Sequence, residues 1–165
     1  MKTRKNVKIT YQPIGIIRTP FRTAEGMPIQ PAGAKLVQGS IDIFPEFSEG
    51  LKDLAGFSHV ILLYHFHRAR KPKLVVTPFM DSKPRGVFAT RAPSRPNSIG
   101  LSVVKLTGIE GSTLHIENAD MLDGTPLLDI KPYVPEFDHY PVDRIGWLRN
   151  RRGAVKDKKS DSRFE

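Results

Sequence analysis

Prolines and glycines divide this chain into short pieces at close intervals. The 165 residues include 14 prolines and 13 glycines, which separate runs rich in β-branched and aromatic residues. Proline lacks the backbone donor that helix interiors and central strands need, and glycine favours turns and bulges. Long helices are therefore hard to place, and the pattern predicts many short strands.

The expected strands are interrupted by one short helix. Residues 39–43 alternate polar and apolar side chains, as in a strand with one buried face. Residues 57–67 form an almost continuous apolar run, which suits a barrel wall. A helix is expected over 48–54, with Ser48 as its N-cap and Gly56 as its stop. The predicted strands span residues 7–19, 34–44, 57–67, 73–79, 86–90, 101–109, 113–118 and 127–133.

This pattern predicts a mainly β protein, a single-sheeted β-barrel with short helices, because closure removes exposed sheet edges. We expect one barrel domain over 7–148 and a basic C-terminal tail over 149–165, disordered from about residue 154. The longest apolar run, residues 60–64, is far shorter than the roughly 18 residues of a membrane span. Since the N-terminus also lacks a secretory pattern, a cytoplasmic protein without a membrane partner is expected.

The net charge of +9 is concentrated in a few segments. Residues 1–10 carry four basic groups and no acid, and residues 144–165 carry eight basic groups and three acids. Residues 68–95 carry eight basic groups and one acid, whereas residues 96–143 carry two and eight. Such clusters attract polyanions by counterion release, so RNA or DNA is the first candidate partner. Basic ends that are merely solvated are the alternative.

Several classes of site are excluded by missing residues. The chain has no cysteine, which removes disulfides, thiolate nucleophiles and Cys-ligated metals. It also lacks the glycine fingerprint of dinucleotide-binding folds and the phosphate loop of nucleotide hydrolases. His65 and His67 have a spacing found in some metal barrels, but Lys71 occupies the position of the carboxylate such a site would need. We therefore expect no metal site.

An arginine-rich segment follows the strand expected at 86–90. Arg91, Arg95 and Asn97 lie among prolines, which cannot continue a sheet ladder. These side chains are therefore expected on a stiff loop at a strand end. The segment is either a charged surface turn or an arginine clamp for a carboxylate or phosphate, and the combination of stiffness with guanidinium groups favours the clamp.

A second segment, residues 120–135, combines carboxylates with an aromatic ring. Asp123 precedes a glycine, so it is either an Asx-turn residue or a functional acid. The exocyclic amine of a nucleobase is a poor nucleophile that needs acceptors for its protons and an aromatic face beneath its ring. Asp129 and Tyr133 are the candidate catalytic residues for these roles.

Motifs spread over residues 13–135 form a recognisable set. They are Ile14-Gly-Ile-Ile-Arg18-Thr-Pro20, Pro28-Ile-Gln30, Gly56-Phe-Ser-His59, Phe66-His67, Gly86-Val-Phe-Ala-Thr-Arg91, Arg95-Pro-Asn97-Ser-Ile-Gly100, Asp123-Gly-Thr-Pro126 and Asp129-Ile-Lys-Pro-Tyr133. Together they resemble the TsaA/TrmO-like family of S-adenosylmethionine-dependent tRNA methyltransferases, which are built on a single-sheeted β-barrel.

The resemblance implies methylation of the exocyclic N6 amine of (threonylcarbamoyl-)adenosine next to the tRNA anticodon. It implies S-adenosyl-L-methionine as cofactor, tRNA as partner, and a homodimer that holds the cofactor near its interface. The sequence departs from the family at Ile29 and Ser98, where arginine and proline are usual, and the second domain of many bacterial members has no counterpart in these 165 residues. The implied cofactor contacts are Pro28, Ile29, Gln30, His67, Arg68, Arg91, Leu101, Asp120, Met121, Leu122 and Asp123.

Two functions of different classes are consistent with these observations. The leading one is an S-adenosylmethionine-dependent tRNA (adenine-N6) methyltransferase with direct in-line transfer, in which the protein positions the reactants and polarises the amine. The alternative is a non-catalytic β-barrel module that binds RNA or adenosylmethionine. Conversion of labelled cofactor to adenosylhomocysteine only in the presence of tRNA would distinguish them.

Overall fold

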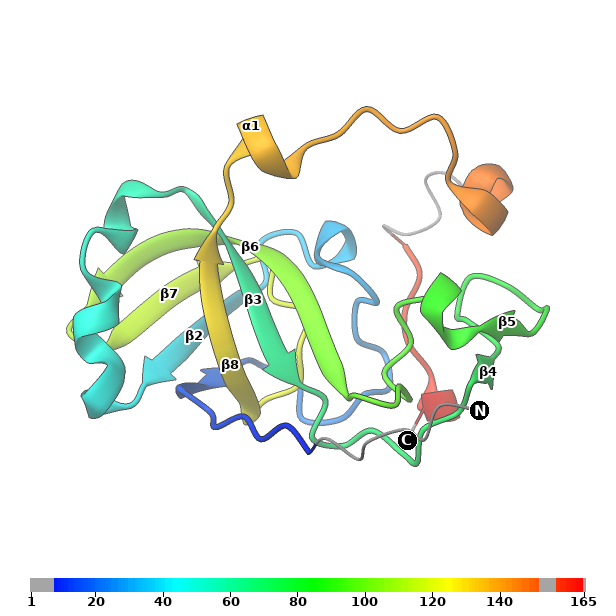
Figure 1. Ribbon diagram of the computed structural model, residues 1–165, viewed down its shortest axis with the longest axis horizontal. Coiled ribbons are helices and arrows are strands. Elements are labelled where there is room, and N and C mark those ends of the chain that lie inside the picture. The colour runs from blue at the N-terminus through cyan, green and yellow to red at the C-terminus, as the bar shows by residue number, and fades with distance from the viewer. Residues whose placement is uncertain (1–7, 152–156, 165) are drawn as a thin grey trace.

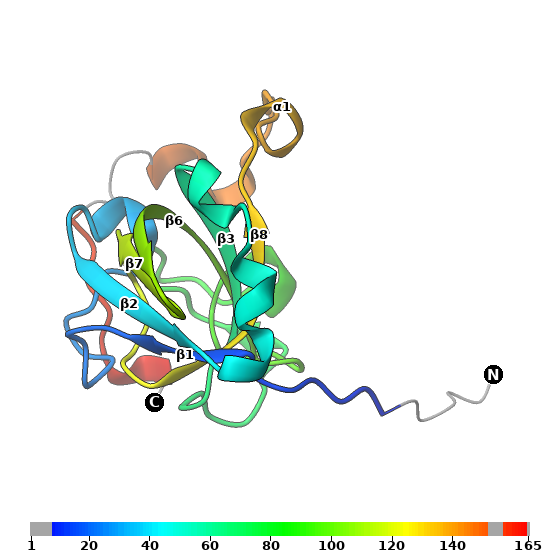
Figure 2. The ribbon, with the colours of Figure 1, turned by 90° about the vertical axis from the view of Figure 1, so that its left-hand side faces the viewer.

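A closed β-barrel forms the centre of the molecule (Figures 1 and 2). The computed structural model describes residues 8–151 and 157–164. The antiparallel strands follow the order β1-β2-β7-β6-β3-β8, and β8 pairs with β1 to close the barrel. This confirms the predicted fold class. The barrel strands are β1 (Gly15–Arg18), β2 (Gln38–Ile43), β3 (His59–His65), β6 (Ile99–Glu110), β7 (Thr113–Glu117) and β8 (Thr125–Pro132).

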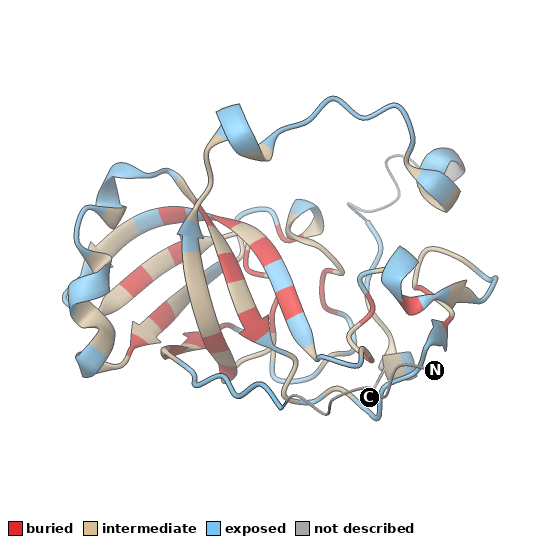
Figure 3. Cartoon of the chain, viewed as in Figure 1, coloured by how far each residue is buried: buried red, intermediate tan, exposed pale blue. Residues whose placement is uncertain are grey.

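Inward-facing side chains form the core of the barrel. Along β3, Val60, Leu62 and Tyr64 are buried and alternate with more exposed neighbours (Figure 3). The inward row of β6 includes Ser102 and Val104, both buried. Full burial of a side chain such as Leu62 contributes about 1.5–3 kcal/mol, so these rows are the main source of stability.

Short helices join the strands. They are the 3₁₀ helices η1 (Pro31–Gly33), η2 (Pro45–Leu51), η3 (Leu54–Gly56), η4 (Val87–Ala89), η5 (Gly146–Arg151) and η6 (Ser162–Phe164), and the α-helix α1 (Pro135–Asp138). Within residues 8–151 and 157–164, no helix has the length and apolar character needed to cross a membrane.

The helix expected over 48–54 is placed differently. It begins at Pro45, because proline presets the backbone angle of a first helical turn. Ser48 does not cap it; the Ser48 hydroxyl lies 2.7 Å from that of Ser112. Asp53 adopts a left-handed conformation (φ 65°) that separates η2 from η3.

Four predicted strands are clearly shorter than expected. Of residues 34–44, only Gln38–Ile43 pairs as β2, because residue 34 ends η1. Only Gly15–Arg18 of residues 7–19 pairs as β1, and residue 7 lies outside the described ranges. Residues 73–79 contain only β4 (Val75–Val76), and residues 86–90 are mostly η4, preceded by β5 (Arg85–Gly86). β4 and β5 pair with each other and not with the barrel. The segment between β3 and β6 is therefore mainly loop, and it packs beside one end of the barrel (Figure 1).

The C-terminal segment lies beside the loop after β1 and beside the segment between β3 and β6, where Arg163 Nη1 donates to Pro78 O at 3.0 Å (Figure 1). The Gly26 amide donates to Ser160 O at 2.9 Å, and the Ser160 amide donates to Met27 O at 2.8 Å. The expected disorder therefore does not describe residues 157–164, because their backbone finds partners that the sequence pattern does not reveal. Residues 152–156 and 165 lie outside the described part of the chain.

Candidate functional site

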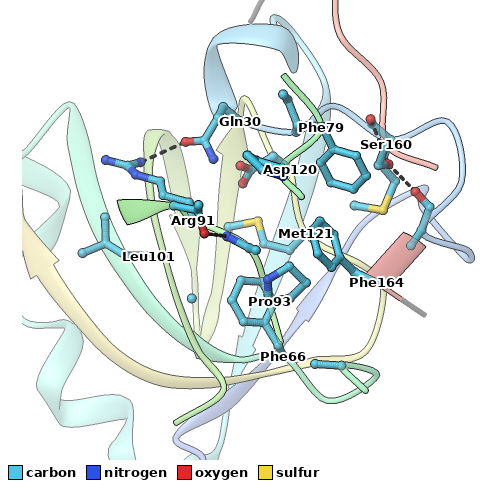
Figure 4. Close-up of a pocket in the computed structure, with 18 of the residues that line it drawn as sticks. Gln30, Phe66, Phe79, Arg91, Pro93, Leu101, Asp120, Met121, Ser160 and Phe164 are labelled. Carbon is cyan, nitrogen blue, oxygen red and sulfur yellow. Dashed lines mark hydrogen bonds between the residues drawn. The ribbon is translucent and has the colours of Figure 1, made fainter. Parts of the chain in front are cut away.

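A cavity of about 950 Å³ opens at the end of the barrel where β3 finishes and β6 begins (Figure 4). One side, here called the barrel wall, is formed by Tyr64, Gly100 and Asp120. Another part of the lining, here called the outer wall, consists of residues 88–93 and 95 together with C-terminal Ser160, Asp161 and Phe164. The volume lies within the roughly 300–1,000 Å³ typical of small-molecule sites.

The cavity collects most of the residues that the sequence motifs implied as cofactor contacts. They come from the loop before η1, the turn after β3, the arginine-rich loop, the start of β6 and the segment before β8. Segments far apart in the sequence thus share one space. The predicted residues that line it are Pro28, Ile29, Gln30, His67, Arg68, Arg91, Leu101, Asp120, Met121 and Leu122.

The arginines of the loop after η4 have different surroundings. Arg91 is exposed, and its Nη1 donates to Gln30 Oε1 at 2.9 Å, so two predicted contacts orient each other (Figure 4). Arg95 Nη1 donates to the carbonyls of Thr90 at 2.9 Å and Val87 at 3.3 Å. Arg95 thus stiffens the loop, whereas the exposed guanidinium of Arg91 lines the cavity. This arrangement matches the clamp interpretation better than that of a simple surface turn.

A chain of hydroxyl groups in the barrel wall ends on Asp120. The Tyr64 hydroxyl lies 3.1 Å from that of Ser102, which donates to Asp120 Oδ1 at 2.7 Å. Tyr64 is 4% exposed and Ser102 is 1% exposed. Neither residue was predicted from the sequence. A serine in the inward row of β6, followed by the apolar Val104, was the available signal.

Burial shifts the proton affinity of two groups in the cavity. It raises the pKa of Asp120 to about 6, against the opposing influence of the Ser102 hydrogen bond and of the Arg91 charge. Burial also lowers the pKa of His67, and the neighbouring Arg68 charge lowers it further. At neutral pH the site therefore presents a carboxylate, a guanidinium and a neutral imidazole.

Asp123 faces a different part of the surface. Its Oδ1 accepts from the Thr19 amide at 3.2 Å, and its Oδ2 accepts from Arg22 Nη1 at 2.6 Å. It lines a shallow groove beside Arg18 and Gln38 rather than the cavity. Both bonds cross from the β8 side to the loop after β1, so Asp123 ties two segments together instead of closing its own Asx turn.

Asp129 and Tyr133 lie on or just after β8, away from the cavity lining. Asp129 stands opposite Leu63 in the β3–β8 ladder, and its carboxylate pairs with Lys131 Nζ at 2.8 Å. The Tyr133 ring packs edge-on against His59, with the ring centroids 6.5 Å apart. Within a single chain, the fold does not bring these two candidate catalytic residues to the cavity.

The C-terminal part of the outer wall was also not predicted from the sequence. Ser160 Oγ donates to the carbonyls of Ala24 and Met27, the latter at 3.1 Å. The Phe164 ring meets Phe79 edge-on, with centroids 5.0 Å apart (Figure 4). No local pattern could have indicated these contacts, because they join residues more than 80 positions apart.

Comparison with known proteins identifies the family. The model of the tRNA-methyltransferase O N-terminal domain matches residues 16–139. The chain therefore belongs to the TrmO family. The resemblance drawn from the motifs is confirmed, and the TrmO fold is shared with solved structures. A crystal structure of TrmO from Pseudomonas aeruginosa matches with a TM-score of 0.72 and 42% identity, over 86% of this chain and 63% of that chain.

Relatives in the TrmO family carry two kinds of name. A probable S-adenosyl-L-methionine-binding protein of Pyrococcus abyssi is 55% identical over 156 residues, which covers 94% of this chain and 85% of that protein. The human tRNA (adenine(37)-N6)-methyltransferase is 38% identical over 135 residues, covering 77% of this chain and 30% of that protein. These names agree with the expected cofactor. The chain thus spans less than a third of the human protein and less than two thirds of the solved Pseudomonas chain.

Proposed function

We propose that this protein is an S-adenosylmethionine-dependent tRNA methyltransferase that acts in the cytoplasm on the N6 amine of (threonylcarbamoyl-)adenosine next to the anticodon. The observation that carries the proposal is the convergence of ten implied cofactor contacts on one cavity. The names of the TrmO relatives support both the cofactor and the tRNA substrate.

The groups around the cavity suit the cofactor's chemistry. Arg91, oriented by Gln30, supplies a cation for the carboxylate of the methionine part. Asp120 supplies an acceptor for amino or hydroxyl protons of the adenosyl part. Met121 and Leu122 supply an apolar surface for the adenine ring. Bound S-adenosylmethionine supplies an electrophilic methyl group, so the protein itself needs no nucleophile.

Asp123 contributes to the same site indirectly. Its bonds to Thr19 and Arg22 hold the turn that follows Asp120–Leu122, and the Arg22 carbonyl in turn accepts from Arg68 Nη1 at 2.8 Å. Arg68 lines the cavity. The expected link between Asp123 and the cofactor is thus assigned to positioning of the cavity lining.

The proposal includes a homodimer formed through the outer face of β3 and β6. Ile99 and Leu101 are 38% and 46% exposed at the rim of the cavity. Leu63 on β3 lies between Leu101 on β6 and Asp129 on β8. The row of apolar side chains across these three strands therefore ends at Asp129. Association would bury these apolar side chains and bring Asp129 of one copy towards the cavity of the other.

The catalytic roles of Asp129 and Tyr133 depend on that second copy. Asp129 would accept amine protons and Tyr133 would offer an aromatic face to the base. Analytical ultracentrifugation of the 18.5 kDa chain tests whether the homodimer forms. A species of twice this mass is expected, and a monomer at every concentration up to that of the activity assay would remove both roles.

Nucleoside mass spectrometry of tRNA incubated with the protein and the cofactor tests the function. We expect one added methyl group on the adenosine derivative next to the anticodon, and adenosylhomocysteine only when tRNA is present. The Arg91→Ala variant is the negative control, because it lacks the cation proposed to bind the cofactor, and it should form little product. Cofactor and tRNA binding without any methylated nucleoside would instead support the non-catalytic module.

A further inference from the structure

The hydrogen-bond chain in the barrel wall has a defined direction. An ionised carboxylate only accepts hydrogen bonds, so the Ser102 hydroxyl must donate its single proton to Asp120 Oδ1. The Ser102 oxygen can then only accept from Tyr64, whose hydroxyl therefore donates. Burial raises the pKa of Tyr64 above its ordinary range, which keeps that donor protonated. The order Tyr64 to Ser102 to Asp120 follows from these facts.

The position of Tyr64 is fixed by its neighbours. A Cβ on Gly100 would come within 2.8 Å of Tyr64 Cδ2 and closer still to Cε2 and Cζ, so the ring lies directly on the glycine backbone. Phe66 meets the same ring edge-on, with centroids 5.4 Å apart. The tyrosine hydroxyl therefore has little freedom to leave Ser102, and burying it without a partner would be unfavourable.

We infer that Ser102 and Tyr64 are positioning residues that hold the Asp120 carboxylate ionised and aimed at the cavity, as the acceptor for an amino or hydroxyl donor of the bound adenosyl group. This inference rests on the proposed function. A carboxylate has about four acceptor positions, and Ser102 is the only side chain among the described residues that donates a hydrogen bond to Asp120, so acceptor capacity remains for a ligand. Neither Ser102 nor Tyr64 belongs to the set of residues implied by the family resemblance.

The ionisation of Asp120 at the end of this hydrogen-bond chain makes ligand binding depend on pH. With a pKa of about 6, Asp120 is a carboxylate above that pH and is protonated below it. Among the described residues, the other charged or titratable groups that line the cavity are Tyr64, His67, Arg68, Arg91, Arg95 and Asp161. Of these, the Arg91 charge lowers the pKa of Asp120, and the pKa of His67 is itself lowered by burial. The affinity for a ligand that donates an amino or hydroxyl proton to Asp120 is therefore highest above about pH 7, and it decreases as the pH falls through 6.

The experiment measures the affinity for adenosylhomocysteine by calorimetry between about pH 5 and pH 8.5. Ser102→Ala removes the donor that favours ionisation, so we expect about tenfold weaker binding at about pH 7.5 and a midpoint moved to higher pH. Ser102→Thr keeps the hydroxyl and should restore most of the affinity. Ser40→Ala, on β2 away from the cavity, is the matched control and should bind like the unchanged protein.

A second readout does not require the ligand. The carboxyl ¹³C shift of Asp120 in the free protein should titrate at a pH of about 6 and should move to higher pH in Ser102→Ala. Wild-type affinity, pH midpoint and carboxyl titration in folded Ser102→Ala would overturn the inference and leave the proposed function intact. Failure of the unchanged protein to bind any adenosyl ligand would instead overturn the proposed function and the ligand role of Asp120 together.

Discussion

The barrel wall and the outer wall of the cavity are built in different ways. Tyr64 and Gly100 belong to strands whose backbone ladders and buried rows also hold the barrel together. The outer wall has almost no ladder; it depends on single hydrogen bonds such as Arg95 to Thr90 O and the Ser160 amide to Met27 O. The difference indicates that the barrel wall contributes strongly to folding and the outer wall contributes little. Under the proposed function, both walls contribute to cofactor binding.

The largest effect is expected from overpacking the barrel wall. Gly100→Ala places a methyl group against the Tyr64 ring and should lower the free energy of unfolding by about 1–3 kcal/mol while weakening cofactor binding. Gly86→Ala, beside the outer wall, is the matched control because nothing lies within 4 Å of its Cβ position. The free energy of unfolding of Gly86→Ala, measured by urea denaturation, should stay within about 0.5 kcal/mol of that of the unchanged protein. Equal free energies of unfolding in the two variants would contradict the proposed difference between the barrel wall and the outer wall.

Arg91→Ala tests the outer wall by removing its exposed cation. We expect S-adenosylmethionine binding to weaken by about 1.5–3 kcal/mol, because a charged hydrogen bond to the ligand carboxylate is removed. The free energy of unfolding should hardly change. Arg70→Ala removes an exposed charge from the same basic segment but not from the cavity lining. If both variants weaken calorimetric binding equally, Arg91 acts only through the overall charge.

Truncation before residue 157 removes the C-terminal part of the outer wall. Cofactor affinity should fall about tenfold, or roughly 1.4 kcal/mol, because Ser160, Asp161 and Phe164 no longer close the cavity. The double variant Lys158→Ala/Lys159→Ala keeps the wall and should affect only tRNA binding. The slope of log affinity against log salt should flatten by about 0.7–0.9 for each phosphate that the protein no longer neutralises. Unchanged cofactor affinity in the truncated chain would show that this segment is not part of the site.

The smallest effect is expected at Asp123, which belongs to neither wall. Asp123→Asn keeps an acceptor for the Thr19 amide and removes only the ion pair with the exposed Arg22, worth about 0.2–1 kcal/mol. Thermal unfolding should shift slightly, and cofactor affinity should stay within about twofold. A decrease of about tenfold or more would mean that the Asp123 charge acts directly on the ligand.

The barrel was predictable because its signals are local. Apolar alternation and the proline breaks located β3, β6, β7 and β8 to within a few residues. The stiff arginine loop was predictable for the same reason, since Pro93 and Pro96 flank Arg95. The segments between β3 and β6 were assigned too many strand residues, because a β-rich pattern does not reveal whether a partner strand exists.

The rest of the site depends on register and on distant contacts. The β3–β8 ladder shifts between Leu63 and Tyr64, so Leu127 and Ile130 both face the core and Asp129 faces outward. A sequence pattern does not reveal such a bulge. Similarly, Ser102 becomes informative only once β6 is paired with β3 in a register that sets it beside Tyr64.

The central claim is that both walls enclose one adenosyl site, and amide chemical-shift mapping tests it most directly. S-adenosylmethionine would be added to ¹⁵N-labelled full-length protein up to saturation. We predict shifts at Gln30 and Arg91, at Asp120 and Met121, and at Ser160, all with one common saturation curve. Shifts confined to one wall, or no shifts at millimolar cofactor, would contradict the claim.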